Sequence, residues 1–370
     1  MTAREDFVVA VLPGDGIGPE VMAPCLDILG QAQRQVGGFT LTLNTVEAGA
    51  AFYAVSGESI PSTSLDHAQQ ADAILLAAMG LPSVRYPDGT EIAPQLELRE
   101  QLGLYAGVRP IRTLAGLPLP LADRRGAHLD AVLIRESTEG LFAARGKTSY
   151  DGDKIARDTM VITRSVCERL FDFAFHLARE RKESGAPGRV TCIDKANVLG
   201  GFAFFRKIFL ERAELFPDIE TDCAYVDAMA LNLVKRPWDF DVMVTENMFG
   251  DILSDLGAAL MGGMGLAPSA DIGDDHAVFQ PCHGSAPDIV GLGKANPTAM
   301  ILSAAMMLEW LGARHDNSWC VVAGSLIRAS VGRAFSSGVL LPFELGGAAG
   351  TDEIVACILE EMQAVDHAPT

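Results

Sequence analysis

The stretch TENMFGDILSD, at residues 245–255, contains the transition on which the predicted fold depends. It follows a mainly apolar run at residues 240–244, which predicts a buried strand. Beyond it, apolar residues recur at helical spacing from Ile252 to Leu260, so we expect a helix to begin near Phe249. The stretch therefore predicts a strand that passes directly into a helix.

Two carboxylates lie on one face of this predicted helix, because Asp251 and Asp255 are four residues apart. They repel each other unless a cation lies between them, and carboxylate oxygens suit Mg2+ or Mn2+. Alternatively, Asp251 favours the helix dipole near the helix start and Asp255 is merely solvated. This stretch alone does not separate the two interpretations.

The chain of 370 residues has the length of about two domains. Apolar residues make up 49% of it, enough for a sizeable core, yet no apolar run reaches the ~18 residues of a membrane span. The net charge of −19, from 48 acidic and 29 basic residues, argues against nucleic acid and anionic membranes as partners.

The cysteines and the start of the chain indicate a cellular compartment. The seven cysteines form no C-x-x-C pair, so we expect reduced thiols and no zinc site. Residues 1–6 are too short and too acidic a segment for a signal peptide. A cytoplasmic protein is therefore expected.

Strand and helix signals alternate along the chain. A buried strand at residues 7–12 is followed by Gly14, Gly16 and Gly18, which resemble a phosphate-cradling turn without having the G-x-G-x-x-G spacing. Another buried strand is predicted at residues 73–78. The alternation predicts an α/β fold with a mostly parallel sheet covered on both faces.

Three arginines each stand beside an apolar strand or helix: Arg99, Arg109 and Arg135. Arginine in such a place is unusual unless it is paired. Each could form a separate structural ion pair. If the three converge, their planar forks would bind a dicarboxylate.

Charged residues also follow predicted strands. Lys195 ends a strand at residues 189–195, and Asp227 ends one at residues 221–227. A lysine there is normally a solvated cap, and it becomes a candidate base only if burial or a nearby cation lowers its pKa. Ligand sites gather at the carboxyl ends of parallel strands, so these residues together with Asp251 and Asp255 favour the metal interpretation.

Five motifs, in order, are the basis of a family resemblance. They lie at residues 13–21, 194–198, 225–230, 247–255 and 283–289. Together they resemble the metal-dependent β-decarboxylating dehydrogenases, which act on isopropylmalate, isocitrate, homoisocitrate, tartrate or D-malate. The resemblance covers nearly the whole chain and is specific for the family more than for the substrate.

The resemblance implies a bilobed isopropylmalate-dehydrogenase-like subunit with α/β/α layers, which is not a Rossmann fold. Residues 1–108 and 262–370 would form the cofactor-binding domain. Residues 109–261 would form the substrate and dimerisation domain, with a clasp arm at about 142–163. The resemblance also implies a homodimer with shared active sites, NAD as cofactor, and Mg2+ or Mn2+.

The resemblance also assigns roles to single residues. Lys195 and Asp227 would be catalytic, lent by one subunit to Asp251 and Asp255 of the other, and the three aspartates would hold the metal. The substrate residues would be Arg99, Arg109, Arg135, Gln95 and Asn197. The cofactor residues would be Ile17, His283, Gly284, Ser285, Ala286, Asp288, Ile289 and Asn296, although His283 taken alone is better explained as a structural residue than as a catalytic one.

The chain departs from the family pattern at three places. Phe142 stands where a tyrosine is usual, so the hydroxyl expected to protonate the enolate carbon is missing. Gln280 stands where a glutamate is common, and the specificity segment at residues 91–96 matches neither the isopropylmalate nor the isocitrate pattern. Gln95 in that segment predicts a somewhat polar side group on the substrate.

Two functional hypotheses follow. The first is an NAD-dependent dehydrogenase that oxidises, and decarboxylates, a 3-substituted malate or a related 2-hydroxy dicarboxylic acid. The second is a catalytically weak paralogue that acts as a regulatory or scaffolding subunit. Phe142 favours the second, whereas the retained Lys195, Asp227, Asp251 and Asp255 favour the enzyme.

Overall fold

A computed structural model describes residues 4–364 of the chain. Residues 1–3 and 365–370 are outside the described residues. They belong to the two ends of the expected cofactor-binding domain, and residues 1–3 are also half of the segment 1–6 that was compared with a signal peptide. No helix in the described part is long and apolar enough to cross a membrane. All seven cysteines fall within this part and are free thiols.

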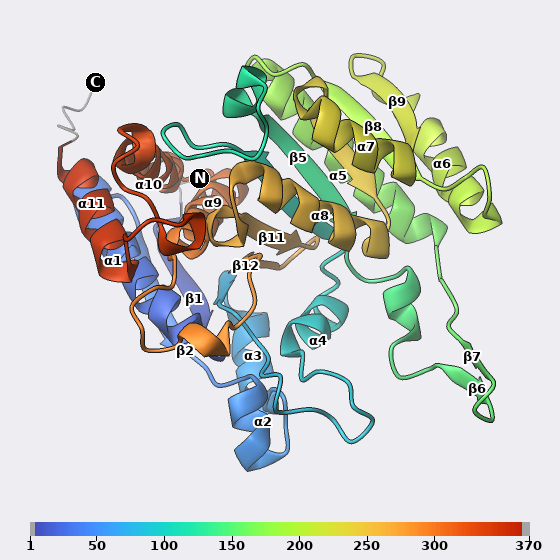
Figure 1. Ribbon diagram of the computed structural model, residues 1–370, viewed down its shortest axis with the longest axis horizontal. Coiled ribbons are helices and arrows are strands. Elements are labelled where there is room, and N and C mark those ends of the chain that lie inside the picture. Colours follow the sequence, from blue (N-terminus) through green and yellow to red (C-terminus); the bar gives the residue numbers. More distant parts are fainter. Residues whose placement is uncertain (1–3, 365–370) are drawn as a thin grey trace.

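A sheet of ten strands crosses the described part of the chain, in the order β2-β1-β3-β12-β11-β4-β5-β10-β8-β9 (Figure 1). The strands are β1 (Asp6–Leu12), β2 (Thr40–Thr45), β3 (Ala73–Leu76), β4 (Ala106–Arg112), β5 (Asp130–Glu136), β8 (Arg189–Asp194), β9 (Glu220–Tyr225), β10 (Val242–Thr245), β11 (Pro268–Ile272) and β12 (Ala277–Pro281).

Most neighbouring strands are parallel, and the exceptions are next to one another. β4 pairs antiparallel with β5 and with β11, and β11 pairs antiparallel with β12. The mostly parallel α/β sheet expected from the sequence is thus confirmed. The strand order also differs from that of the Rossmann dinucleotide-binding fold.

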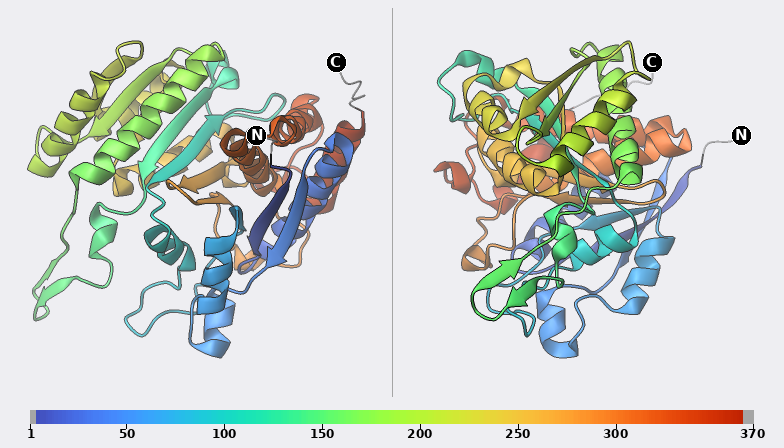
Figure 2. Two further views of the ribbon diagram at one scale, coloured as in Figure 1. Left: turned by 180° about the vertical axis from the view of Figure 1, so that it is seen from behind. Right: turned by 90° about the vertical axis from the view of Figure 1, so that its right-hand side faces the viewer.

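Helices cover both faces of the sheet, as the two views of Figure 2 show. One face is covered by α1 (Gly18–Val36), α5 (Arg164–Glu183), α6 (Gly200–Ala213) and α9 (Thr298–His315), and on this side α10 (Ser318–Ser336) packs on α9 and α11 (Thr351–Gln363) packs on α1 and α10. The other face packs against α3 (Ser62–Gln70), α4 (Pro94–Gln101), α7 (Val226–Lys235) and α8 (Asn247–Met261), while the short α2 (Ala50–Ser56) precedes α3.

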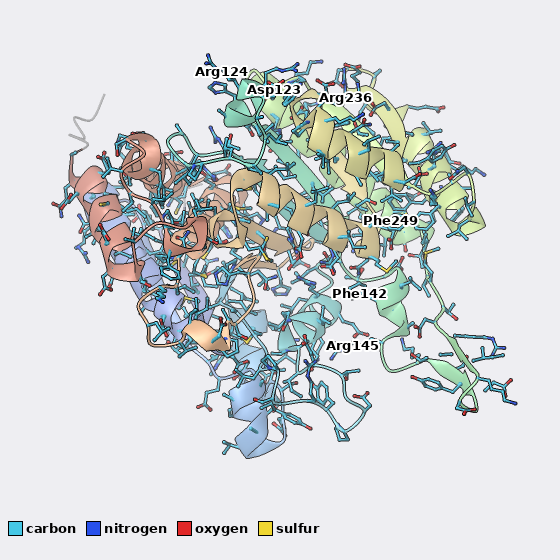
Figure 3. The ribbon with its side chains drawn as sticks, in the orientation of Figure 1. Asp123, Arg124, Phe142, Arg145, Arg236 and Phe249 are labelled. Atoms are coloured by element: carbon cyan, nitrogen blue, oxygen red, sulfur yellow. The ribbon has the colours of Figure 1, made fainter. Side chains whose placement is uncertain are left out.

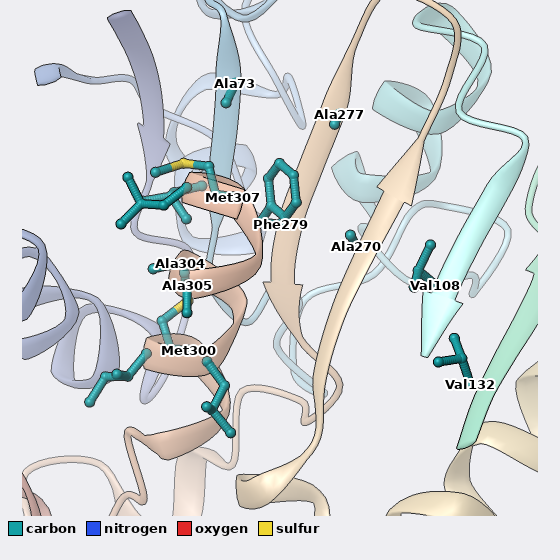
Figure 4. Close-up of a cluster of buried hydrophobic side chains, with 14 of the residues drawn as sticks. Ala73, Val108, Val132, Ala270, Ala277, Phe279, Met300, Ala304, Ala305 and Met307 are labelled. Atoms are coloured by element: carbon teal, nitrogen blue, oxygen red, sulfur yellow. The ribbon is translucent and has the colours of Figure 1, made fainter. Parts of the chain in front are cut away.

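The apolar runs of the sequence form strands in the core of the protein. Every residue of β3 and of β10 is buried, as expected for strands that are covered on both faces. Met300 and Met307 of α9 are fully buried, and Met307 lies beside Phe279 of β12, so both methionines fill the core (Figure 4).

The strand-to-helix transition at residues 245–255 is present, with an earlier helix start. α8 begins at Asn247, because Glu246 is its N-cap and its Oε1 accepts a hydrogen bond from the Phe249 backbone N–H at 2.8 Å. The expected start near Phe249 is therefore two residues late.

The place predicted for Asp227 also needs correction. β9 ends at Tyr225, and α7 begins at once, so Asp227 lies in the first turn of a helix and not at the end of a strand. The helix begins there because Met229 and Leu233, one turn apart, are both buried against the sheet.

The polar segment predicted as an arm forms a small hairpin of β6 (Ser149–Asp151) and β7 (Ile155–Arg157). All six residues of these strands are exposed, and the hairpin stands away from the rest of the chain in the left view of Figure 2. Clasping of a partner subunit by this arm stays a prediction.

The glycines after β1 allow close packing of the loop. A Cβ on Gly14 would lie 2.1 Å from the carbonyl oxygen of Ala78, and one on Gly16 would lie 2.0 Å from that of Ser285. Both glycines have positive φ angles, of 77° and 58°. These close approaches account for both glycines without a bound phosphate.

Replacing Gly14 by alanine should destabilise the fold strongly, because the new Cβ meets backbone atoms that cannot move aside. Gly57 is a matched control, since its φ of 81° is similar but nothing lies within 4 Å of its Cβ position. We expect Gly57→Ala to cost about 1 kcal/mol from its backbone angle alone, and Gly14→Ala to cost about 3 kcal/mol or more. Urea unfolding followed by circular dichroism measures both, and equal costs would contradict the packing argument.

Candidate active site

A cleft of about 770 Å³ collects most of the predicted substrate residues. It is lined by residues of α4, the β4–β5 pair, α8 and the loop after β12, and by residues at the base of the arm. Its lining includes Gln95, Arg99, Arg109, Arg135, Asp251 and Asp255. The convergence of the three arginines, left open by the sequence, is therefore observed.

Arg99 and Arg109 share one buried carboxylate, that of Asp271 on β11. Arg99 Nε donates to Asp271 Oδ2 at 2.9 Å, and Arg109 Nη2 donates to Asp271 Oδ1 at 3.0 Å. Burial alone would raise the pKa of Asp271, yet the guanidinium groups of Arg109, Arg99 and Arg135 hold that pKa well below its ordinary value. Asp271 is therefore a permanent anion behind the cleft.

Arg135 is held by the helix that carries the two aspartates. Its Nε and Nη2 donate to Asn247 Oδ1 at 3.0 and 2.8 Å, and its Nη1 forms an ion pair with Asp251. Burial, followed by the charge of Arg99, lowers the pKa of Arg135 to about 10, so it remains a cation at neutral pH.

Close approach of α8 to β5 positions this contact. A Cβ on Gly250 would lie 2.6 Å from Cγ of Arg135, and one on Gly257 would lie 2.6 Å from Cδ1 of Ile111. These glycines are seven residues apart and so face the sheet on the same side of the helix. Any side chain at Gly250 would displace Arg135.

Asp251 and Asp255 line the cleft from α8, as their spacing predicts. Burial, and then the negative charge of Asp251, raise the pKa of Asp255 above its ordinary value. Two carboxylates four residues apart on one helix face supply oxygen ligands, which fit a hard divalent cation such as Mg2+ or Mn2+.

Asp227, the third predicted metal ligand, does not reach this cleft within one chain. Its Oδ1 accepts a hydrogen bond from Lys195 Nζ at 2.6 Å, and neither residue lines the cleft. Asn197, the nearby substrate candidate, is exposed. Within residues 4–364, no group of three or more acidic, His or Cys side chains could hold a metal.

The predicted cofactor residues lie on and around the loops after β1 and β12, and two of them reach the cleft. The Ile17 N–H donates to the Ser285 carbonyl oxygen at 2.8 Å, which joins the loop after β1 to the loop after β12. His283 and Gly284 line the cleft, and Nε2 of His283 is buried without a hydrogen-bond partner. Burial lowers the pKa of His283, so its ring is neutral and can accept or donate a hydrogen bond through Nε2.

The remaining cofactor candidates surround this loop. Ala286 has a left-handed backbone with φ of 36°, and Ile289 packs partly against the core. Asn296 Nδ2 donates to Glu344 Oε1 at 2.6 Å, whereas Asp288 is exposed. None of the predicted cofactor residues on this loop therefore carries a positive charge.

A model of the isocitrate/isopropylmalate dehydrogenase family matches residues 8–358, which is nearly the whole chain. The chain belongs to this family. It is 40% identical to the 3-isopropylmalate/3-methylmalate dehydrogenase of Methanocaldococcus jannaschii, over 94% of this chain and 96% of that relative. It is also 40% identical to the 3-isopropylmalate dehydrogenase of Moorella thermoacetica, over 96% of this chain and 99% of that relative.

Solved structures of the same family have the same fold. The isocitrate dehydrogenase of Methylococcus capsulatus superposes with a TM-score of 0.84 at 34% identity, over 96% of this chain and 99% of that one. A β-decarboxylating dehydrogenase of Thermococcus kodakarensis superposes with a TM-score of 0.78 at 36% identity, over 96% of each chain. This isocitrate/isopropylmalate dehydrogenase family member is therefore an oxidoreductase acting on a CH–OH group, and the expected fold class is confirmed.

Sequence reasoning missed two groups at the site of this dehydrogenase, one behind the cleft and one in its lining. Asp271 could have been noticed as an acid within the apolar strand β11. Arg145 lines the cleft beside Phe142, and Figure 3 shows both on the segment that leads into the arm. Arg145 carried no signal, because it lies in a polar segment interpreted only as an arm.

Replacing Asp251 by asparagine should abolish turnover while leaving the fold intact, because an amide is a weaker ligand for a divalent cation than a carboxylate. Asp275→Asn is the matched control, since Asp275 is 83% exposed at the far end of the β11–β12 hairpin. Mn2+ binding by calorimetry and activity with excess chelator provide the measurements. Full activity of wild type in chelator would contradict a metal role.

Proposed function

We propose that this chain catalyses the NAD-dependent oxidation and decarboxylation of a 3-substituted malate or a related 2-hydroxy dicarboxylic acid, with Mg2+ or Mn2+. The observation that supports this most is the meeting of Arg99, Arg109 and Arg135 with Asp251 and Asp255 in one cleft. Cationic forks suit carboxylates, and paired carboxylates suit a cation that can also hold the substrate.

The arginines would bind and orient the two substrate carboxylates. A divalent cation held by Asp251 and Asp255 would lower the pKa of the substrate hydroxyl and stabilise the enolate left after loss of CO2. NAD would accept the hydride. Oxidation gives a 2-keto acid with a carboxylate β to the ketone, and this arrangement allows CO2 to leave.

Lys195 and Asp227 would reach this cleft from a second copy of the chain. Lys195 would take the hydroxyl proton, and Asp227, whose pKa is lowered by its hydrogen bond from Lys195, would remain ionised beside it. We further propose the two-domain division and the clasp arm given above, with a homodimer as the unit that has complete sites. Free thiols and the net charge of −19 are in keeping with a cytoplasmic protein that binds neither nucleic acid nor membrane.

The side group of the substrate would lie against Gln95, Phe142 and Arg145, which line one part of the cleft. Gln95 Oε1 is buried without a hydrogen-bond partner, so it offers an acceptor to a donor on that side group. Phe142 offers an apolar surface beside it. A substrate whose side group is partly apolar, with a hydrogen-bond donor, fits this combination.

The alternative function is that of a catalytically weak paralogue with a regulatory or scaffolding role. Phe142 is the observation in its favour, because it lacks the usual acidic hydroxyl. A screen of malates, tartrates, isopropylmalate and isocitrate with Mn2+ and NAD, following NADH and CO2 separately, tests both. Turnover of a hydroxy dicarboxylate supports the enzyme, whereas binding without any NADH supports the alternative.

NAD should be preferred over NADP. Asp288 is exposed on the cofactor loop, where its carboxylate can accept hydrogen bonds from ribose hydroxyls and would repel a 2′-phosphate. Lys294 is the opposing feature, but its Nζ lies 4.1 Å from the centre of the Phe343 ring, a cation–π contact. The specificity constant should therefore be higher for NAD, and Asp288→Lys should shift it toward NADP while Asp275→Lys does not. An equal or higher value for NADP in wild type would refute this preference.

Phe142→Tyr should raise the yield of decarboxylated product per NADH formed. Phe142 lines the cleft with its ring 5.1 Å from the Arg135 guanidinium, so a hydroxyl added there reaches the substrate region. General acid catalysis contributes roughly 10²–10⁴-fold, and hydride transfer does not need this group. Tyr150, the other donor considered, is 73% exposed on the arm and does not line the cleft of its own chain.

The ratio of CO2 to NADH on a malate-type substrate is the measurement. Wild type that already forms the two in equal amounts, at a rate unchanged by Phe142→Tyr, would mean that Phe142 simply packs against an apolar substrate.

A further inference from the structure

A single acid without exposed surface lies directly behind the cleft arginines. Asp271 Oδ2 accepts hydrogen bonds from Arg99 Nε at 2.9 Å and from Gln280 Nε2 at 2.6 Å. Its Oδ1 accepts from Arg109 Nη2 at 3.0 Å and from the Ser137 hydroxyl at 3.3 Å. Asp271 does not line the cleft, so it acts on a ligand only through these partners.

The sheet keeps room for this carboxylate. Asp271 on β11 pairs with Gly107 on β4, and Gly107 pairs with Arg135 on β5, so the three residues lie in one row. A Cβ on Gly107 would lie 3.1 Å from Asp271 Oδ1 and 2.6 Å from the Ser137 hydroxyl oxygen. Glycine in the middle of a strand is thereby explained by the approach of an acid from the neighbouring strand.

Arg99 and Arg109 differ in how many of their guanidinium nitrogens are hydrogen-bonded. Arg109 is fixed, because its Nη1 also donates to the carbonyl oxygens of Val108 and Ala270 at 3.1 and 2.9 Å. Arg99 uses only Nε, and among the described residues its two terminal nitrogens have no hydrogen-bond partner. Arg99 therefore presents its free edge to the cleft while its position is set from behind.

Because position 280 is a glutamine, Asp271 is the only acid of this contact pair behind the cleft arginines. The family commonly has a glutamate there, and a carboxylate at position 280 would face the carboxylate of Asp271 across the 2.6 Å contact. The amide of Gln280 instead donates a hydrogen bond to Asp271. In this chain the negative charge behind the arginines is therefore carried on β11.

The positive charge of Arg145, the fourth arginine of the cleft, is also compensated by a nearby carboxylate. Arg145 Nη2 lies 4.0 Å from Glu97 Oε1. Asp271 offsets one charge of the Arg99–Arg109 pair, and Asp251 is paired with Arg135. The side chains of the cleft, without the divalent cation, thus leave little uncompensated positive charge for a third anionic group on a ligand.

We propose that Asp271 is a positioning residue that sets the anionic charge accepted by the cleft. By fixing Arg99 and Arg109 and offsetting one of their charges, it favours dicarboxylates with an uncharged side group over tricarboxylates. The proposal rests on the proposed function, which supplies the class of ligand.

The test compares Asp271→Asn with wild type, using kcat/KM for isopropylmalate and for isocitrate with Mn2+ and NAD. Removing one buried negative charge from behind the cleft arginines should shift the ratio toward the tricarboxylate by on the order of tenfold. The double variant Asp271→Asn with Gln280→Glu returns one acid to the site and should bring the ratio back toward that of wild type.

Asp241→Asn is the control for simple destabilisation. Asp241 is another fully buried acid, and its Oδ1 lies 2.6 Å from Arg181 Nε. Neither residue lines the cleft. It should lower thermal stability and leave the substrate ratio unchanged. A ratio that stays the same in Asp271→Asn, or that moves equally in Asp241→Asn, overturns the proposal.

Ligand binding separates this proposal from the proposed function. The thermal stabilisation of each variant by malonate and by tricarballylate, a dicarboxylate and a tricarboxylate without a hydroxyl group, needs no turnover. Asp271→Asn should gain more stabilisation from tricarballylate than from malonate, relative to wild type. If wild type oxidises no hydroxy acid and this shift is still found, the proposed function fails while the charge selection stands.

Discussion

The cleft depends on keeping three guanidinium groups close together in a largely buried space. Removing one partner of a buried ion pair costs about 3–5 kcal/mol, because a charge is then left without compensation. Asp271, Asp251 and Asn247 supply that compensation from β11 and α8. The strands and helices that meet here are therefore held together by the same contacts that orient the arginines.

The antiparallel strands in the middle of the sheet follow from the same requirement. Arg109 on β4 reaches the Ala270 carbonyl oxygen on β11, and Gly107 gives Asp271 the room to lie beside Arg135. Helix α8 approaches the sheet closely at Gly250, which turns Asp251 toward Arg135. The three arginines, which are far apart in the sequence, thus belong to one connected group of hydrogen bonds and ion pairs.

The sequence predicted the elements better than the contacts. β1 (Asp6–Leu12) ends where the predicted strand at residues 7–12 ends and begins one residue earlier, because its apolar run is unbroken. Asp227 was misplaced because no loop separates β9 from α7, and such a junction has no glycine or proline to mark it. Asp271 was missed because its partners Arg99 on α4 and Arg109 on β4 lie 172 and 162 residues away in the chain, which leaves no local pattern. The family motifs, by contrast, contain Asp251, Asp255, His283 and Gly284 of the cleft lining, whereas Gln95 and the three arginines lie outside the motifs.

The central claim is that the cleft of one chain is completed by Lys195 and Asp227 of another. Two variants, Lys195→Met and Asp251→Asn, are prepared separately, and their subunits are then exchanged by mild denaturation and refolding together. In a mixed dimer, one site combines the intact Asp251 of one chain with the intact Lys195 of the other. The account predicts that activity returns to about a quarter of the wild-type value, since half of the dimers are mixed and each has one intact site. Mixed dimers, verified by mass spectrometry, that stay as inactive as the two parents would contradict it.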